Sequence, residues 1–373
     1  MGARHRVLYK DAFSYCAHPH AVRAANGDML VVFNRVPRRP YILHPPEDPL
    51  YRNVMIRSFD NGVTWSEPQV VPGYDWSGTE CAGLTILRNG TVLLNQWRFD
   101  WLPLGLAKRL SGSRRLEYPD SFMRGWLNSP EHDTGLYQDM TAEQLAPWAR
   151  GGGETWVHMS DDHGQSFQGS VRIDTAPFSG GYGMRGACEL ANGDILLPLS
   201  DVPNWKAVFT VRSRDGGLTW DKPLKVAEQP GSEFEEPAMI ETAPGHLLMV
   251  LRDNGTRCLH AVTSSDDGKS WTPPLRLPVE GYPAHLVPLG RGRLLLTYGW
   301  RQPDYGIRAV LSNDNGATWA TQETIHIRGG LPNKNLGYPV TVPINDNHLL
   351  TIYYGEDGEG VTCILGTWWR MPA

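Results

Sequence analysis

A carboxylate, a phenol and several guanidinium groups stand beside short apolar runs in this sequence. Glu236 precedes the run 237–240, Arg252 follows the run 247–251, and Tyr338 precedes a further run near the end of the chain. A phenol with its ordinary pKa of about 10 is a poor nucleophile until a neighbouring carboxylate accepts its proton. Arginine binds carboxylates through two parallel hydrogen bonds. These residue types therefore suit nucleophilic chemistry on a substrate that carries a carboxylate.

These residues belong to a pattern that recurs along the chain: a residue and a proline, a short apolar strand, a turn and a Leu-rich strand. Proline is tolerated at the first residue of a strand, where no hydrogen-bond donor is needed. Six copies predict six blades around a channel, and the residues that begin the innermost strands should converge on one mouth. Those residues are His18, Glu80, Arg185, Glu236, Tyr282 and Tyr338.

A second repeat alternates with the first and has the form S-x-D-x-G-x-[ST]-[WF]. Its five copies begin at Ser58, Ser160, Ser213, Ser264 and Ser312. The Asp side chain can accept hydrogen bonds from the backbone of a tight turn, and the Gly permits a conformation that a Cβ would penalise. The final aromatic residue can anchor the turn on an apolar surface. A repeat of roughly fifty residues predicts a radial or solenoidal fold.

This octet resembles the Asp-box of the sialidase (neuraminidase) superfamily, and the resemblance spans nearly the whole chain. It implies an all-β fold in which residues 1–373 form a single six-bladed β-propeller catalytic domain. One long insertion, at about residues 98–155, interrupts blade 2, and Thr141 with Gln144 predicts a capping box that opens a short helix there. The insertion could be a lid or an inert or oligomer-forming decoration. The strand-like segments 6–9 and 361–365 are expected to share a blade and close the ring.

The resemblance also assigns roles. Segment 335–342 is similar to the late segment that supplies the sialidases' catalytic tyrosine, which makes Tyr338 the nucleophile. The Glu236 element resembles the one whose Glu activates that nucleophile and whose following Arg, here Arg252, binds the substrate carboxylate. Sialidases are the glycosidases in which Tyr replaces a carboxylate nucleophile. Because side chains alternate along a strand, only one of Glu235 and Glu236 is expected to face the channel.

A third arginine of the carboxylate clamp is expected in segment 298–308. Arg308 is the first choice and Arg301 the second, and Arg185 could join them from the mouth of blade 3. His18, Glu80 and Tyr282 complete the expected substrate-binding residues.

The sequence departs from the family pattern in two places. Sialidases open with a motif whose Arg is the first of three, but the matching segment 15–19 has no Arg, so that His18 or His20 would face the channel. The acid/base residue is expected at Asp48 or Glu47, and Glu80 is a rival from the next blade. An acid of this kind must reach the leaving oxygen with a suitable pKa, which a sequence does not show.

Composition narrows the functional classes. The 373 residues carry a formal charge of -5 and no Lys/Arg run, which argues against nucleic acid as a partner. No apolar stretch is long enough to span a membrane. The five widely spaced cysteines predict reduced thiols, and the short N-terminal apolar run predicts a cytoplasmic protein, or a mature form whose leader was removed. No cluster has the spacing of metal ligands, so neither a metal nor another cofactor is expected. A homo-oligomer is compatible with the sequence.

Three functions follow from these expectations. The leading one is a retaining exo-glycosidase that releases a terminal acidic sugar, either sialic acid or a related nonulosonic acid such as pseudaminic or legionaminic acid. The second keeps the propeller but moves the chemistry to His18 or His20, as in a uronate-recognising glycosidase or polysaccharide lyase. The third is a non-catalytic propeller that binds carbohydrate or protein.

Overall fold

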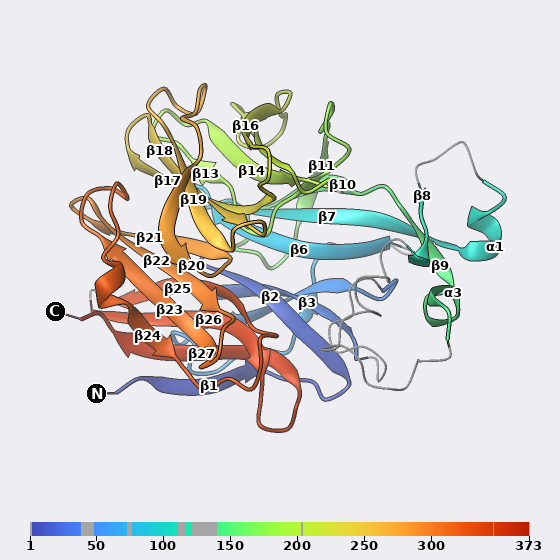
Figure 1. The fold of residues 1–373 in the computed structure, drawn as a ribbon, viewed down its shortest axis with the longest axis horizontal. Helices are drawn as coiled ribbons and strands as arrows, with labels where there is room; N and C mark the ends of the chain where they lie inside the picture. Colours follow the sequence, from blue (N-terminus) through green and yellow to red (C-terminus); the bar gives the residue numbers. More distant parts are fainter. Residues whose placement is uncertain are drawn as a thin grey trace.

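The structure is a computed structural model that describes residues 2–38, 48–72, 77–110, 116–120, 140–202, 204–345 and 347–372, without the side chains of residues 77, 78 and 80. The described residues form six sheets that succeed one another along the chain as the blades of a β-propeller (Figure 1). The predicted all-β fold and its six blades are confirmed.

Each blade is an antiparallel sheet whose first strand lies innermost. Blade 1 contains β2 (Ser14–Arg23), β3 (Met29–Pro37), β4 (Arg52–Ser58) and β5 (Gln69–Val70). Blade 2 contains β6 (Ser77–Ile86), β7 (Val92–Pro103), β10 (Glu154–Ser160) and β11 (Gln168–Ile173). Blade 3 contains β12 (Gly181–Tyr182), β13 (Cys188–Glu189), β14 (Ile195–Asp201), β15 (Ala207–Ser213) and β16 (Leu224–Glu228).

The second half of the chain repeats the same arrangement. Blade 4 contains β17 (Phe234–Ala243), β18 (His246–Asp253), β19 (Cys258–Ser264) and β20 (Leu275–Glu280). Blade 5 contains β21 (Ala284–Gly290), β22 (Arg293–Trp300), β23 (Gly306–Ser312) and β24 (Ile325–Arg328), with a 3-10 turn η1 (Thr321–Glu323) before β24. Blade 6 contains β25 (Gly337–Asn345), β26 (His348–Glu356), β27 (Thr362–Arg370) and β1 (Arg4–Tyr9).

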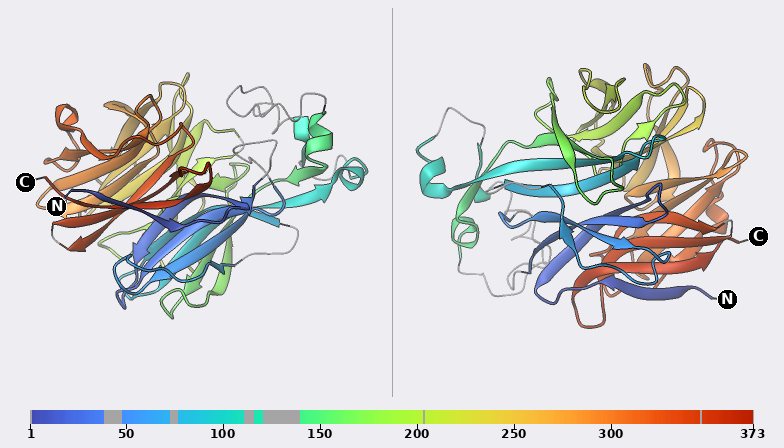
Figure 2. Two further views of the ribbon diagram at one scale, coloured as in Figure 1. Left: turned by 90° about the horizontal axis from the view of Figure 1, so that it is seen from below. Right: turned by 180° about the vertical axis from the view of Figure 1, so that it is seen from behind.

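The two ends of the chain close the ring, as the sequence predicts. β1 pairs antiparallel with β27, from Arg4 opposite Trp368 to Tyr9 opposite Ile364. Figure 2 shows the blue first strand beside the red last strands. The outer strand of blade 6 therefore comes from the start of the chain, and backbone hydrogen bonds join both termini in one sheet.

The hydrophobic core is divided among the interfaces between neighbouring blades. One cluster joins Leu30 of blade 1 to Leu94 of blade 2, and another joins Val250 of blade 4 to Leu296 of blade 5. Both faces of a middle strand are thus covered, and every residue of β14 is buried. This explains why the middle strands appear in the sequence as continuous apolar runs and not as alternating ones.

The repeated octets form the turns that follow the third strand of a blade. In each of the five copies, all within the described residues, the Ser hydroxyl donates to the Asp and accepts from the Gly N–H, and the Asp accepts from the N–H of the seventh residue. The fourth residue of each copy has positive φ, as does the Gly. Gly, Asn and Asp tolerate this left-handed region best, which explains the octet's composition.

The insertion in blade 2 extends a strand and adds helices. β7 continues to Pro103 and pairs there with β9 (Trp148–Gly151), which in turn pairs with β8 (Leu116–Glu117). With α1 (Leu104–Ala107) and α3 (Ala142–Leu145), these strands project from one side of the propeller (Figure 1). The capping box of Thr141 and Gln144 is present, as predicted. None of the described helices is long and apolar enough to span a membrane.

Candidate active site

The innermost strands of blades 1, 2, 4 and 6 carry the same irregularity near their start. His18, Cys81, Glu236 and Tyr338 have φ between 40° and 55°, and the pairing with the second strand is interrupted at each of them. This β-bulge turns one side chain out of the alternation of the strand. The three prolines that follow His18, Glu236 and Tyr338 lie within the bulge and not at the first residue of the strand, where the sequence placed them.

The equivalence of these four residues corrects one prediction. Cys81, and not Glu80, occupies in blade 2 the place that His18, Glu236 and Tyr338 occupy in their blades. The proline that marks the other copies is Ala82 here, so the sequence offers no signal that separates Glu80 from Cys81. The side chain of Glu80 lies outside the described residues.

Glu236 lies at the centre of the cluster. The Tyr338 hydroxyl donates a hydrogen bond to Glu236 Oε1, and Arg252 Nη1 donates to Oε2 at 2.7 Å. Arg252 Nη1 also lies 3.5 Å from the Tyr338 hydroxyl. All three side chains are largely buried although they come from blades 4 and 6. The sequence prediction that Glu236, Arg252 and Tyr338 meet agrees with this geometry.

The expectation that only one of the two adjacent glutamates faces the channel is wrong. Glu235 Oε1 lies 3.2 Å from Arg252 Nε, and it also accepts a hydrogen bond from Asn254 Nδ2. The bulge between Glu235 and Ala238 breaks the alternation of the strand, so both carboxylates reach the same guanidinium. Arg252 is thereby fixed from two sides.

Burial and charge hold the proton on the tyrosine. Burial and the negative charge of Glu236 raise the pKa of Tyr338 well above 10. Burial also raises the pKa of Glu235, against the opposing charge of Arg252. Tyr338 is therefore a neutral phenol whose proton already points at a carboxylate, which is the nucleophile-and-base arrangement.

Tyr282 and a second arginine border the cluster. The guanidinium of Arg252 lies 4.2 Å from the centre of the Tyr282 ring, and that of Arg301 lies 5.5 Å from the same ring and 5.8 Å from the Tyr338 ring. Arg301 Nε donates to the Leu336 carbonyl at 2.9 Å. Two guanidinium groups thus lie beside the tyrosine pair.

Arg308, the first choice for the third arginine, lies elsewhere. It is on β23, the third strand of blade 5, where its guanidinium covers the Trp300 ring at 3.7 Å and lies 4.0 Å from Asp304 Oδ2. No contact among the described residues joins it to Tyr338 or Glu236. The second choice, Arg301, lies beside the cluster instead, because Arg301 directly follows the end of β22, whereas Arg308 lies on the next strand outward.

His18, from the segment where the family pattern has an arginine, lies against the tyrosine of the cluster. Its ring centre lies 4.3 Å from that of Tyr338 and 5.2 Å from that of Tyr354. Asn34 Nδ2 lies 2.8 Å from His18 Nδ1 and 3.5 Å from Cys81 Sγ. Sequence reasoning missed Asn34, Cys81 and Tyr354, because a lone Asn, Cys or Tyr within an apolar strand resembles any core residue.

The acid/base candidates are placed only in part. Asp48 is buried and its Oδ1 accepts a hydrogen bond from Leu50 N at 2.8 Å, just before Tyr51, whose hydroxyl lies 3.4 Å from Asn34 Nδ2. This brings Asp48 to the blade 1 side of the cluster. Glu47 lies outside the described residues.

Arg185 lies deeper in the channel. It is buried, and its Nε donates to the Ala284 carbonyl of blade 5 at 3.0 Å. Two histidine rings near it, His20 and His285, have centres 6.0 Å apart. His20 is thus below the site, whereas His18 is in it.

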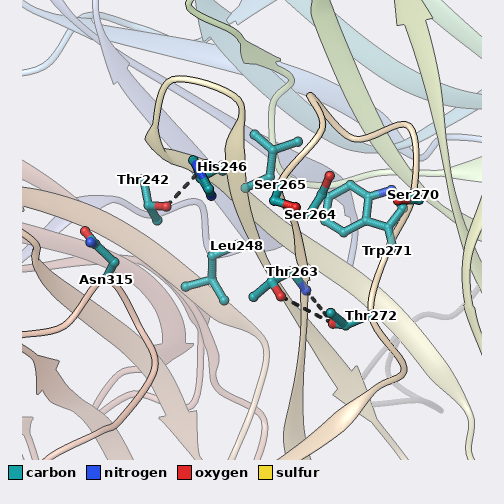
Figure 3. Close-up of a pocket in the computed structure, with 11 residues that line it drawn as sticks. Thr242, His246, Leu248, Thr263, Ser264, Ser265, Ser270, Trp271, Thr272 and Asn315 are labelled. Atoms are coloured by element: carbon teal, nitrogen blue, oxygen red, sulfur yellow. Dashed lines mark hydrogen bonds between the residues drawn. The ribbon is translucent and has the colours of Figure 1, made fainter.

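A cavity on the opposite end of the propeller does not match this chemistry. It has a volume of about 310 Å³ and lies between the octet turn of blade 4 and Asn315 of blade 5 (Figure 3). Two of its hydroxyls already bond within the fold: Ser270 Oγ donates to Asp266 and Thr242 Oγ1 to the His246 carbonyl. The described residues contain no group of three or more His, Cys, Asp or Glu side chains that could hold a metal ion.

The comparisons with known proteins agree with this fold. The model of the BNR repeat-like domain matches residues 140–350, more than half of the chain. The chain belongs to this family. A comparison with curated protein sequences finds no match.

Solved structures share the BNR-repeat propeller at low identity. A protein of unknown function from Dyadobacter fermentans is 25% identical, with a TM-score of 0.81 and complete coverage of both chains. The NanB sialidase of Streptococcus pneumoniae is 12% identical, with a TM-score of 0.67 over 98% of this chain and 70% of its own. The α-L-arabinofuranosidase Arb93A of Fusarium graminearum is 11% identical, with a TM-score of 0.60 over 98% and 97%. The chain is therefore a sialidase-like BNR-repeat propeller of a kind that glycosidases use.

Proposed function

We propose that the protein is a retaining exo-glycosidase that releases a terminal acidic sugar, sialic acid or a related nonulosonic acid, from glycoconjugates. The observation that carries the proposal is the hydrogen bond from the Tyr338 hydroxyl to Glu236, with Arg252 on the other oxygen of the same carboxylate. Tyrosine nucleophiles belong to sialidase-type glycosidases, whereas most glycosidases use a second carboxylate.

In the first step, Tyr338 Oη attacks the anomeric carbon as its proton passes to Glu236. The bond from that carbon to the leaving oxygen breaks, and an acid protonates this oxygen. We assign the acid to Asp48 or Glu47, of which Asp48 is the better supported because it lies on the blade 1 side of the cluster. In the second step, the acid of the first step, now a carboxylate, takes a proton from water as the water oxygen displaces Tyr338 Oη from the anomeric carbon. Glu236 returns its proton to Tyr338 and so regenerates the phenol. Two displacements at one carbon retain its configuration.

Arg252 and Arg301 are proposed to hold the sugar carboxylate. Their guanidinium groups lie 4.2 and 5.5 Å from the centre of the Tyr282 ring, close to the nucleophile. A neutral tyrosine suits such a substrate, because a second carboxylate at the reacting carbon would repel the carboxylate of the sugar. His18 replaces the third guanidinium in this scheme, which favours an acidic sugar other than the one that an ordinary three-arginine site binds.

The test is hydrolysis of a fluorogenic panel by the wild type and Tyr338→Phe. The panel contains glycosides of sialic, pseudaminic and legionaminic acid and one uronide. We expect turnover of one nonulosonic acid glycoside and a loss of at least about 10³-fold in kcat for Tyr338→Phe. Tyr353→Phe is the matched control, because Tyr353 is a buried tyrosine of β26 whose hydroxyl bonds Thr367 at 2.9 Å. Unchanged kcat in Tyr338→Phe would exclude the tyrosine mechanism.

A second candidate function rests on His18, whose ring contacts that of Tyr338 where the family pattern has an arginine. In this candidate the protein is a uronate-recognising glycosidase or polysaccharide lyase in which His18 moves the proton. Turnover of the uronide alone, lost in His18→Gln but kept in Tyr338→Phe, would favour it. A panel without turnover but with saturable binding of one sugar would instead favour a carbohydrate-binding propeller.

A further inference from the structure

One charged side chain lies at the hub of the propeller. Arg185 begins on blade 3, and its Nε donates to the Ala284 carbonyl on blade 5 at 3.0 Å, so its side chain spans the central channel. Its charge acts on groups of the other blades: Cys81 of blade 2, Glu236 of blade 4, Tyr338 of blade 6 and the histidines of blades 1 and 5. The guanidinium is therefore enclosed on all sides by the ring.

This guanidinium lacks an acceptor for most of its hydrogen atoms. Arg185 is 4% exposed, and neither Nη1 nor Nη2 has a hydrogen-bond partner among the described residues. Glu236, the carboxylate whose charge acts on Arg185, already accepts from Tyr338 and from Arg252, one on each oxygen. A buried cation whose N–H groups are unpaired is unfavourable, so such groups are normally found with a counterion.

The two histidines beside Arg185 also present donors. His20 Nδ1 accepts a hydrogen bond from Leu84 N at 3.0 Å, and His285 Nδ1 accepts one from Thr341 N at 3.3 Å. A backbone N–H can only donate, so each neutral ring carries its proton on Nε2. Burial and the charge of Arg185 lower the pKa of His20 to about 3 and that of His285 well below 6.5, which keeps both rings neutral. Among the described residues, the hub therefore combines the positive charge of Arg185 with the Nε2–H donors of two neutral histidines.

We propose that Arg185 binds one small inorganic anion, a halide such as chloride, in the channel, with Nε2–H of His20 and His285 as further donors. Water could accept some of these hydrogen bonds, but it would leave the charge of the guanidinium uncompensated. A halide supplies both the acceptor and the charge. This site lies below the tyrosine cluster and does not depend on the proposed glycosidase activity.

The test is the thermal stability of the full chain against chloride or bromide concentration. A ligand that binds only the folded state raises the melting temperature with concentration, so we expect a steady rise between about 1 and about 300 mM halide. A bulky organic sulfonate keeps the ionic strength constant. In Arg185→Met the melting temperature should no longer depend on halide. Equal halide dependence in both proteins would overturn the proposal.

Arg212→Met is the matched control. Arg212 is a buried arginine whose guanidinium is already paired with Asp194 and the Asp267 carbonyl, so its loss should lower the melting temperature but keep the halide dependence. A second measurement needs no variant: anomalous diffraction from a wild-type crystal soaked in bromide should show a peak at the Arg185 guanidinium. No peak there would overturn the proposal even if Arg185→Met did not fold.

Free N-acetylneuraminate and glucuronate form a separate arm of the same experiment. Stabilisation by a sugar acid that requires Arg185, in a protein indifferent to halide, would overturn the halide site and assign Arg185 to the substrate carboxylate. Unchanged kcat in Tyr338→Phe would contradict the glycosidase proposal, and unchanged halide dependence in Arg185→Met would contradict the halide site. The two failures are therefore distinguishable.

Discussion

Arg252 is the residue on which the charges of the candidate site converge. It pairs with Glu236 at 2.7 Å and with Glu235 at 3.2 Å, and its guanidinium lies against Tyr282. A single guanidinium thus holds the base and a second carboxylate in fixed places. Glu235 keeps Arg252 charged and oriented, which leaves Glu236 to accept the tyrosine proton. The two adjacent glutamates of the sequence therefore have different roles: Glu235 orients Arg252, and Glu236 accepts the proton.

At the residue scale we predict the effect of Glu236→Gln. The amide cannot take the phenol proton, so kcat should fall by about 10²–10⁴-fold, the usual contribution of a general base, with little change in KM. Steady-state kinetics on the substrate that the panel identifies measures this. The exposed Glu233→Gln, three residues earlier on the same blade, is expected to leave kcat unchanged. A Glu236→Gln enzyme with wild-type kcat would remove the base from the mechanism.

At the scale of elements, the octet turns join one blade to the blade before it. A Cβ built on Gly268 of blade 4 would lie 2.7 Å from Leu196 Cδ1 of blade 3, and one on Gly62 of blade 1 would lie 2.7 Å from Leu350 Cδ2 of blade 6. The octet Gly is thus needed twice, for its positive φ and for the close approach of the preceding blade. Strand pairing also puts these turns at the end of the blade away from the tyrosine cluster, since Ser58 pairs with Met29 and Asn53 with Asn34.

Gly268→Ala should therefore destabilise the fold more than a matched glycine change. Both Gly268 and Gly216 have positive φ, at 77° and 76°, but a Cβ on Gly216 meets nothing within 4 Å. Each substitution should cost about 1–2 kcal/mol for the left-handed backbone, and Gly268→Ala a further 1–3 kcal/mol, roughly, for overpacking. Urea unfolding measures the difference. Equal losses in the free energy of unfolding would show that the close approach of Gly268 to Leu196 does not stabilise the interface between blades 3 and 4.

The octet carboxylates predict a loss of stability in acid. Hydrogen bonds from Thr64 lower the pKa of Asp60 to about 2, and those from Thr219 do the same for Asp215. A carboxyl with a folded-state pKa below its unfolded value, about 3.9, stabilises the fold above that pH and loses this effect as the pH falls to about 2. Melting temperatures between pH 6 and pH 2 should therefore fall most below pH 4. Asp215→Asn should show a smaller fall, and an unchanged fall would assign it to other groups.

At the scale of the molecule, ring closure depends on a strand that contributes little core. Most residues of β1 are exposed, and the side chains that pack against the core are Leu8 and Tyr9, whose ring centre lies 5.2 Å from that of Phe33. Its other contacts include backbone pairing with β27, a hydrogen bond between His5 Nδ1 and Thr367 Oγ1, and the Arg4 guanidinium 5.9 Å from the Trp368 ring. Its pairing nevertheless covers the edge of β27, which would otherwise expose unpaired backbone groups.

Deletion of residues 2–9 should consequently lower the melting temperature and promote association through the exposed edge of β27. Thermal unfolding and light scattering measure the two effects. Removal of Pro372 and Ala373, which follow the last strand, is the control and should change neither. A truncated protein that melts like the wild type would show that blades 1 and 6 hold together without β1.

The sequence predicts those features that depend on local chemistry. The five octets follow from Asp, Gly and the final aromatic residue, and the six copies of the other repeat predict six blades. Glu236, Arg252 and Tyr338 follow from the resemblance of their segments to those of sialidases. The bulges cannot be predicted from the sequence. His18, Cys81, Glu236 and Tyr338 have left-handed backbone conformations that depend on tertiary contacts and not on a local sequence pattern. For the same reason the sequence misplaces the blade 2 residue at Glu80 and excludes one of the two glutamates. It prefers Arg308 to Arg301 because it does not show that β22 ends at Trp300 and that Arg308 lies on the next strand outward.

At the bulges, the chemical nature of the side chain varies while the strand pairing of the blade stays the same. An imidazole, a thiol, a carboxylate and a phenol occupy the same irregular position in four blades, and β-pairing resumes one or two residues later in each. Four different chemical groups therefore fit one backbone template. An engineer could exchange them for one another, or for other side chains, and keep the strands unchanged, which makes this ring of positions a ready scaffold for reactions that the natural protein does not perform.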